Sequence, residues 1–236
     1  MLPALAAAPV DGPELIFQGH FSREGLDALK ARHAALSPTP QWLVVDSGGG
    51  DAMLGMELGE WVAEQGLGVR VRHVCMSACA NYVFVAARRR HIEPGAVVAW
   101  HGSAVQATFM DPVHMENEFR AMVAEQAQMS AAERAAMLAE LLPQVPTLIA
   151  GVRSRQRALF ARAGVDECIT VIGQITGKAQ EFWFLSVADM ARFGLRDVQA
   201  QADYLRTDVS ALQARAPVQP LVLDEADLAR CAELPR

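Results

Sequence analysis

Residues 69–83, VRVRHVCMSACANYV, run from an apolar strand directly into a helix and place Ser77 at the junction. A serine there has two interpretations. It can be the N-cap of the helix, as most serines at such positions are. It can also be the nucleophile of a strand-to-helix elbow, with its hydroxyl above the sheet, although the Gly-x-Ser-x-Gly signature is absent. This stretch alone leaves both open.

Strands alternate with helices on both sides of this stretch. Apolar runs predict further strands at 14–19, 42–47 and 96–100, and amphipathic spacing predicts helices at 22–36 and 52–66. The run at 42–47, WLVVDS, shows no polar alternation, which is typical of a strand buried on both faces of a parallel sheet. We therefore expect an α/β fold with right-handed crossovers.

The remainder divides into three parts. Residues 112–163 are expected to be helical, with a capping box at Ser130 and Glu133. Residues 182–194 are expected to form a strand and a helix capped by Ser186 and Asp189. One domain is expected over 14–204, followed by a C-terminal tail (205–236) with a short strand and helix. Residues 1–13 are either a disordered N-terminus or the remnant of a signal peptide.

The composition excludes several classes of function. The chain has 236 residues and a net charge of −6, which argues against a nucleic-acid partner. No run approaches the roughly 18 uninterrupted apolar residues of a membrane span, so we expect a soluble chain without a transmembrane segment. No metal is expected, because Cys75 and Cys79 lack a second close Cys or His pair. No nucleotide or other cofactor is expected.

The four cysteines are Cys75, Cys79, Cys168 and Cys231. They are too few for a disulfide-dense scaffold, and buried free thiols are favoured. A bridge between Cys75 and Cys79 would need a turn that brings their Cα atoms within about 7 Å.

A glycine turn follows the strand at 42–47. In DSGGGD (46–51) the glycines leave backbone N–H groups unblocked beside a helix N-terminus, which suits an oxyanion. The spacing matches neither a dinucleotide fingerprint nor a phosphate-binding loop. A plain tight turn is the alternative interpretation.

His101 follows the strand at 96–100 and lies 24 residues after Ser77. Because parallel strands end at the same edge of a sheet, the two side chains are expected to meet there. A general base must come within about 3 Å of the hydroxyl that it activates. The other histidines are interpreted as surface or strand residues, although His20 also follows a strand and stays a candidate.

Together these segments resemble the Clp protease peptidase subunit and its crotonase-like superfamily. The matching segments are SGGG (47–50), Ser77, His101 and FLSVADMARFGLRDV (184–198). The resemblance implies a ClpP/crotonase-like superhelix of stacked β-β-α units with a mainly parallel sheet and a helical C-terminal half. It further implies a serine peptidase that acts on a peptide or protein and forms a homo-oligomer.

By the same resemblance, Ser77 would be the nucleophile and His101 the base. The oxyanion and substrate would be held around Gly49, Gly50, Asp51 and Ala78. The Cys-x-Ser-Ala-Cys form is closest to bacterial Clp-peptidase-like proteins that often carry export signals, which implies a periplasmic or secreted protein, with a cytoplasmic one as the alternative.

The chain departs from this family at the third member of the triad. Phe182 stands where the family has aspartate, and Glu181 beside it is the nearest substitute, with Asp166 and Asp189 as further alternatives. Besides a serine hydrolase, the sequence therefore leaves open an inactive module that binds peptides or proteins. An acyl-CoA enzyme of the crotonase branch is a third reading, without paired carboxylates to support it.

Two further patterns have ordinary structural interpretations. The basic run 88–90 is expected to be a solvated turn. The near-helical spacing of Met115, Phe119, Met122 and Met129 predicts a core or subunit contact rather than a lipid-binding face.

Overall fold

The computed structural model describes residues 13–179, 181–213 and 216–234. The stretch 1–12, on which the signal-peptide interpretation depends, lies outside the described residues. The described part has a mixed α/β fold with a mostly parallel sheet, and about half of it is helical. This confirms the expected α/β class.

A six-stranded sheet forms the centre of the molecule, in the order β1-β2-β3-β4-β7, with β5 pairing to the far end of β3. Every pairing in it is parallel. The strands β1, β2, β3 and β5 fall where apolar runs predicted them, and β4 and β7 were not predicted. The bounds are β1 Leu15–Gln18, β2 Trp42–Ser47, β3 Gly68–Met76, β4 Arg90–Ile92, β5 Val97–Ala99 and β7 Val198–Gln199.

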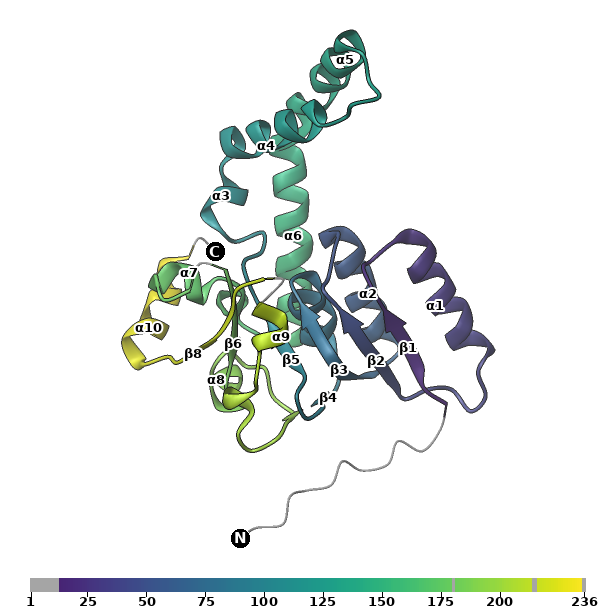
Figure 1. Ribbon diagram of the computed structural model, residues 1–236, viewed down its shortest axis with the longest axis vertical. Coiled ribbons are helices and arrows are strands. Elements are labelled where there is room, and N and C mark those ends of the chain that lie inside the picture. Colours follow the sequence, from purple (N-terminus) through teal and green to yellow (C-terminus); the bar gives the residue numbers. More distant parts are fainter. Residues whose placement is uncertain (1–12, 180, 214–215, 235–236) are drawn as a thin grey trace.

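Helices cover this sheet (Figure 1). α1 (Arg23–Ala35) is capped by Ser22 and packs against β1, and α2 (Ala52–Glu64) is capped by Asp51. η1 (Cys79–Phe84), a π-helical segment, follows β3 and is buried throughout. α2 packs against both η1 and α6 (Val145–Ala163). The helix that follows Ser77 is therefore an internal element of the fold.

The middle of the chain forms a helical projection. Figure 1 shows α6 rising from the body, with α4 and α5 at its far end. The bounds are α3 Ala107–Met110, α4 Pro112–Ala124, α5 Ala131–Leu141 and η2 Leu142–Gln144. The predicted capping box of Ser130 and Glu133 is present at the start of α5.

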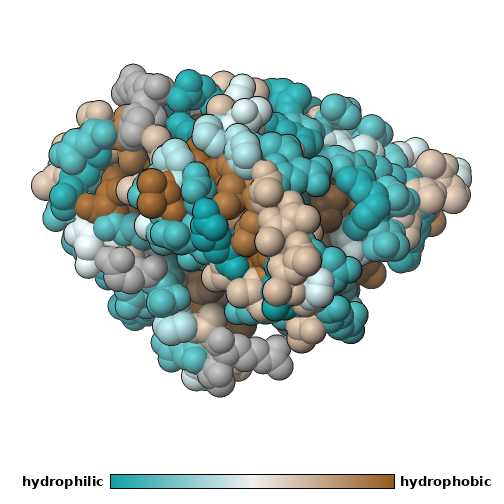
Figure 2. All heavy atoms as spheres, turned by 90° about the horizontal axis from the view of Figure 1, so that it is seen from above, coloured by the Kyte–Doolittle hydropathy of each residue, from teal (hydrophilic) through white to brown (hydrophobic). Residues whose placement is uncertain are grey.

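The projection is not packed as a core. Val123 is the single buried residue of α4, and the apolar set predicted as core or subunit contact (Met115, Phe119, Met122 and Met129) is half-buried or exposed. The prediction of a core contact is therefore wrong, while the subunit contact stays a prediction. Figure 2, which looks onto this end, shows hydrophobic residues between hydrophilic ones.

One helical run, residues 131–163, is long and apolar enough to cross a membrane by length and composition, and 17% of its most apolar window is buried. Buried core helices and signal sequences satisfy the same two criteria. The run therefore does not by itself assign the protein to a membrane, and the expected lack of a transmembrane segment stays a prediction.

The C-terminal part adds a small parallel pair, β6 (Phe182–Leu185) with β8 (Val218–Leu221). An antiparallel bridge between Trp100 and Trp183 joins this pair to the end of β5. The predicted strand and Ser186-capped helix of this stretch are β6 and α8. The remaining bounds are η3 Glu167–Thr170, α7 Ile172–Thr176, α8 Val187–Arg192, η4 Tyr204–Arg206, α9 Ser210–Gln213, α10 Glu225–Ala229 and η5 Arg230–Glu233.

The cysteines form two disulfides, Cys75 with Cys79 and Cys168 with Cys231. The expectation of buried free thiols is therefore wrong. The turn after β3 brings the Cα atoms of the first pair to 5.2 Å, inside the range that permits a bridge. The second pair joins η3 to η5, residues 63 positions apart in the chain.

The basic run was also misread in part. Arg88 and Arg89 are exposed, but Arg90 begins β4 and is 6% exposed. Its guanidinium donates to the carbonyls of Phe84, Val85 and Arg196, so the side chain binds the end of the helix instead of solvent.

The contact between α2 and η1 predicts a difference between two helical glycines. A Cβ at Gly59 would overlap the carbonyl of Tyr82, whereas one at Gly151 in α6 would meet nothing within 4 Å. Gly59→Ala should lower the free energy of unfolding by about 1–3 kcal/mol through overpacking. Gly151→Ala should raise it by up to about 1 kcal/mol through helix propensity. Urea denaturation measures both, and equal effects would contradict the packing described.

Candidate active site

Ser77 lies in the tight turn between β3 and η1. Its φ is +55°, a conformation uncommon for a residue with a side chain. The turn is held by backbone bonds from Ser77 N to Ala99 O (3.1 Å) and from Asn81 N to Ser77 O (2.8 Å). The helix after it has no side-chain cap. The structure thus gives Ser77 the geometry of an elbow and not that of an N-cap.

The Ser77 hydroxyl forms its hydrogen bond with His101, whose Nε2 lies 2.8 Å from Oγ. This proximity follows from the sheet, because β3 and β5 are adjacent parallel strands with Met76 paired to Ala99. His101 therefore leaves the same edge of the sheet as Ser77. When Nε2 is unprotonated, the hydroxyl donates to it, which is the arrangement that a general base requires.

Burial lowers the pKa of His101 below its ordinary value of 6.5, and the charge of nearby Glu181 opposes this shift. The imidazole is therefore neutral at pH 7 and can accept a proton. The pKa is lowered because burial removes the water that would stabilise the protonated, charged ring.

The far side of the His101 ring faces Phe182, with ring centroids 4.4 Å apart. Within the described residues, no hydrogen bond reaches Nδ1 of His101. Glu181 is exposed and acts on the ring only through its charge. The other two proposed substitutes are engaged elsewhere, since Asp166 caps η3 and Asp189 binds Ser186 and Arg192.

The glycine turn after β2 lies directly against the Ser77 turn. A Cβ on Gly49 would come within 2.6 Å of Met76 O and 2.9 Å of Ala78 N, so only glycine fits at this contact. The Gly49 N–H, predicted as an oxyanion donor, already donates to Ser47 Oγ at 3.0 Å. The serine that ends β2 thus engages this N–H, whose role as an oxyanion donor stays a prediction.

Gly50 and Ala78 are better placed as donors. Both line the hollow that contains Ser77 and His101. The Gly50 N–H has no acceptor within the described residues, and Ala78 lies in the first helical turn, where N–H groups have no intrahelical partner. Asp51, predicted to contact substrate, caps α2 by accepting from Leu54 N at 2.8 Å.

The hollow at Ser77 has a volume of about 180 Å³. Its lining is largely apolar, with a few polar groups. Asn81 is notable because its Oδ1 is buried without a partner in the described part of the chain, so it can accept a hydrogen bond from a ligand. The lining residues are Gly50, Ala52, Ser77, Ala78, Asn81, Tyr82, His101, Gly102, Ser103, Ala104, Gln106, Phe109 and Val152.

Three amide side chains fix the loop that carries His101. Gln174 Nε2 donates to His101 O (2.9 Å), and Asn81 Nδ2 donates to the carbonyl of Gly102 (2.9 Å). Gln156, which is fully buried, accepts from the Ala104 N–H. The sequence analysis missed all three. Of the three, Asn81 alone could have been found from sequence, because it lies one helical turn after Ser77. Gln156 and Gln174 come from distant segments of the chain.

The disulfide between Cys75 and Cys79 brackets Ser77 symmetrically, with one residue between the serine and each cysteine. Both cysteines are fully buried. The bridge closes the turn that holds Ser77 at positive φ, so it restrains the position of the hydroxyl.

The remaining histidine candidate is not part of this arrangement. His20 is exposed beside Gly48 and has no hydrogen bond to Ser77. His73, interpreted as a strand residue, pairs with Asp46 at 2.9 Å. His101 is thus the histidine that the fold brings to Ser77.

No protein-family model matches the chain, and no curated protein matches it significantly.

The electrostatics of His101 predict its titration. Its imidazole should titrate below pH 6.5, and Glu181→Gln should lower the pKa further, because the carboxylate favours the protonated ring. Glu140→Gln, at an exposed site on α5, should leave the value unchanged. NMR titration of the His101 ring protons measures this pKa in the wild type and in both variants. A wild-type pKa above 6.5, or a higher pKa in Glu181→Gln, would be incompatible with this environment.

Proposed function

We propose that the protein is a serine hydrolase that acts on peptide bonds, with Ser77 as the nucleophile and His101 as the general base. The observation that carries the proposal is the 2.8 Å contact between Ser77 Oγ and His101 Nε2 at a turn with positive φ. A hydroxyl is a weak nucleophile until an adjacent base takes its proton. Here the base is neutral at pH 7 and already in contact.

The reaction follows from the positions of the groups. Ser77 Oγ attacks the scissile carbonyl while His101 takes its proton, and the N–H groups of Gly50 and Ala78 stabilise the oxyanion. The protonated imidazole then gives the proton to the leaving amine, and an acyl-enzyme remains. Water, deprotonated by His101, releases the acid and restores Ser77. No metal or cofactor takes part.

Phe182 occupies the place of the triad carboxylate, and this lowers the turnover expected of the site. In a Ser-His enzyme the carboxylate holds the imidazole tautomer, and its loss can cost about 10⁴ in kcat. The Phe182 ring and the bond from Gln174 to His101 O fix the position of the imidazole but not its tautomer. We therefore expect slow turnover.

We propose, in addition, a specific fold family, a homo-oligomeric assembly and a cellular compartment. The glycine turn, the Ser77 elbow and the parallel sheet support a ClpP/crotonase-like superhelix. The helical projection, with Val113, Met122, Met137 and Leu148 exposed, supports assembly as a homo-oligomer. The two disulfides favour an oxidising compartment, so we place the protein in the periplasm or outside the cell.

A second candidate is a module that binds peptides without cleaving them. It is favoured by Phe182, an apolar ring in the place where the triad would need a carboxylate. The same hollow, with the unpartnered Asn81 Oδ1, would then hold a peptide N–H.

A fluorophosphonate probe separates the two candidates. It should attach to Ser77, as located by mass spectrometry, and the rate should fall at least about a hundredfold in His101→Ala because the base is lost. Gln128→Ala, at an exposed site outside the Ser77 hollow, should leave it unchanged. Folded protein that is not labelled, or is labelled elsewhere, would refute the hydrolase and favour the binding module.

The two disulfides predict opposite effects on reactivity and stability. Cys75→Ala/Cys79→Ala frees the Ser77 turn, so labelling should slow on the order of a hundredfold, as expected for a displaced nucleophile. Cys168→Ala/Cys231→Ala should leave labelling nearly unchanged. Its cost to stability should be larger, because it opens a longer loop, 63 residues against 4. Equal labelling rates in both folded variants would show that the bridge does not position Ser77.

A further inference from the structure

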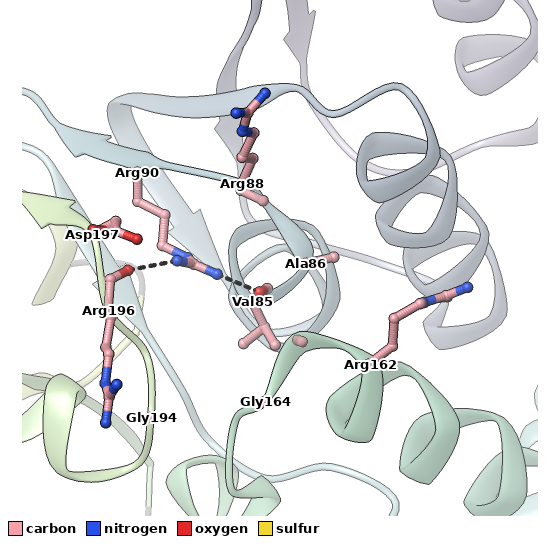
Figure 3. A pocket seen from close by; sticks show the side chains of 11 residues that line it. Val85, Ala86, Arg88, Arg90, Arg162, Gly164, Gly194, Arg196 and Asp197 are labelled. Carbon is pink, nitrogen blue, oxygen red and sulfur yellow. Dashed lines mark hydrogen bonds between the residues drawn. The ribbon is translucent and has the colours of Figure 1, made fainter.

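A second hollow, of about 530 Å³, lies at the opposite end of the helix that begins after Ser77. The last residues of that helix meet the C-terminal ends of α6 and α8 there, at the start of β4. Its lining is Val85, Ala86, Ala87, Arg88, Arg90, Arg162, Ala163, Gly164, Gly194, Arg196 and Asp197. Figure 3 shows the four arginines on separate segments around the hollow, with the Arg90 guanidinium directed toward Val85 and the side chains of Arg88, Arg162 and Arg196 extending outward.

Arg90 is the buried arginine of this lining. It is 6% exposed, and its guanidinium donates to Phe84 O (2.7 Å), Val85 O (2.6 Å) and Arg196 O (2.6 Å), two of which appear as dashed lines in Figure 3. These contacts use three of its five N–H groups. Burial lowers the pKa of Arg90 to about 10, while the charge of Asp197 opposes the shift. The buried cation has no hydrogen-bonded carboxylate within the described residues.

Three further guanidinium groups surround the hollow. Arg88 follows the helix that begins after Ser77, Arg162 lies in the last turn of α6, and Arg196 follows α8. All three are exposed, and none has an ion-pair or side-chain hydrogen-bond partner in the described part of the chain. Asp197 supplies the one carboxylate of the lining. Four arginines and one aspartate leave a formal charge of +3, in a chain whose net charge is −6.

Helix C-termini attract cations, so the helix ends could in principle account for these arginines. Their carbonyls are already engaged, however. Arg90 takes those of Phe84 and Val85. At the ends of α6 and α8, backbone N–H groups bind the carbonyls: Gly164 N donates to Ala161 O, and Gly194 N donates to Ala191 O. The three exposed guanidinium groups are therefore not needed as helix caps.

We propose that this hollow binds a small molecule that carries at least two anionic oxygen groups, as phosphates or carboxylates. Guanidinium groups bind either oxyanion through paired N–H donors. The volume lies in the range of small-molecule sites. The anion would compensate the buried charge of Arg90, and the long exposed side chains of Arg88, Arg162 and Arg196 would turn inward to contact it.

This site is distinct from the one at Ser77. The two hollows share no lining residue and lie at opposite ends of one helix. The proposal is therefore independent of whether Ser77 is a nucleophile.

Isothermal titration calorimetry on the full chain, with both disulfides intact, tests the site. Pyrophosphate and citrate are titrated separately at one ionic strength set with sodium chloride. At least one should bind saturably to a single site, and the tighter of the two identifies the phosphate or carboxylate form. Saturable binding of neither would overturn the proposal.

Charge-matched variants locate the binding. Arg162→Gln/Arg196→Gln removes two exposed arginines of the hollow and should lower the affinity for the anion about tenfold or more. Arg120→Gln/Arg157→Gln removes two exposed arginines elsewhere, one on α4 and one on α6, and should leave the affinity unchanged. All four sites are exposed, so both proteins should fold, as thermal unfolding verifies. Equal affinities in the two variants would overturn the proposal.

Discussion

The hydrogen bond between Ser77 Oγ and His101 Nε2 depends on one constraint: β3 and β5 are adjacent and parallel, so their last residues meet at one edge of the sheet. The positive φ at Ser77 then lifts the hydroxyl out of the strand direction. The Gly49 contact and the Cys75–Cys79 bridge hold this turn from two sides. A shift of either strand would separate the hydroxyl from the imidazole.

The surroundings of His101 show how the ring is placed without a carboxylate behind it. Amide side chains bind the backbone carbonyls of His101 and Gly102, and the ring itself packs on Phe182. Packing fixes where the imidazole lies, whereas a carboxylate would also stabilise the charged form that develops during reaction. The site thus has the geometry of a Ser-His pair, with weaker support for its protonated state.

Much of the fold could be predicted from sequence, because β1, β2, β3 and β5 are apolar runs that alternate with amphipathic helices. β4 and β7 were missed because they have only three and two residues and no hydrophobic pattern. Arg90 was misread because its partners are the carbonyls at the end of the preceding helix and that of Arg196, which are brought around it only in the folded chain. Ser77 and His101 were predictable because their place at strand ends follows from parallel topology alone. The Gly49 N–H bond to Ser47 and the disulfide at the Ser77 turn were not, because they depend on turn geometry.

The central claim is that the Ser77 turn, His101 and the glycine turn form one site for a tetrahedral oxyanion. A crystal structure of the protein after reaction with diisopropyl fluorophosphate tests it most directly. We expect phosphorus bonded to Ser77 Oγ and the phosphoryl oxygen within hydrogen-bond distance of the N–H groups of Gly50 and Ala78. An adduct whose phosphoryl oxygen points away from both N–H groups, with His101 displaced from Oγ, would contradict it.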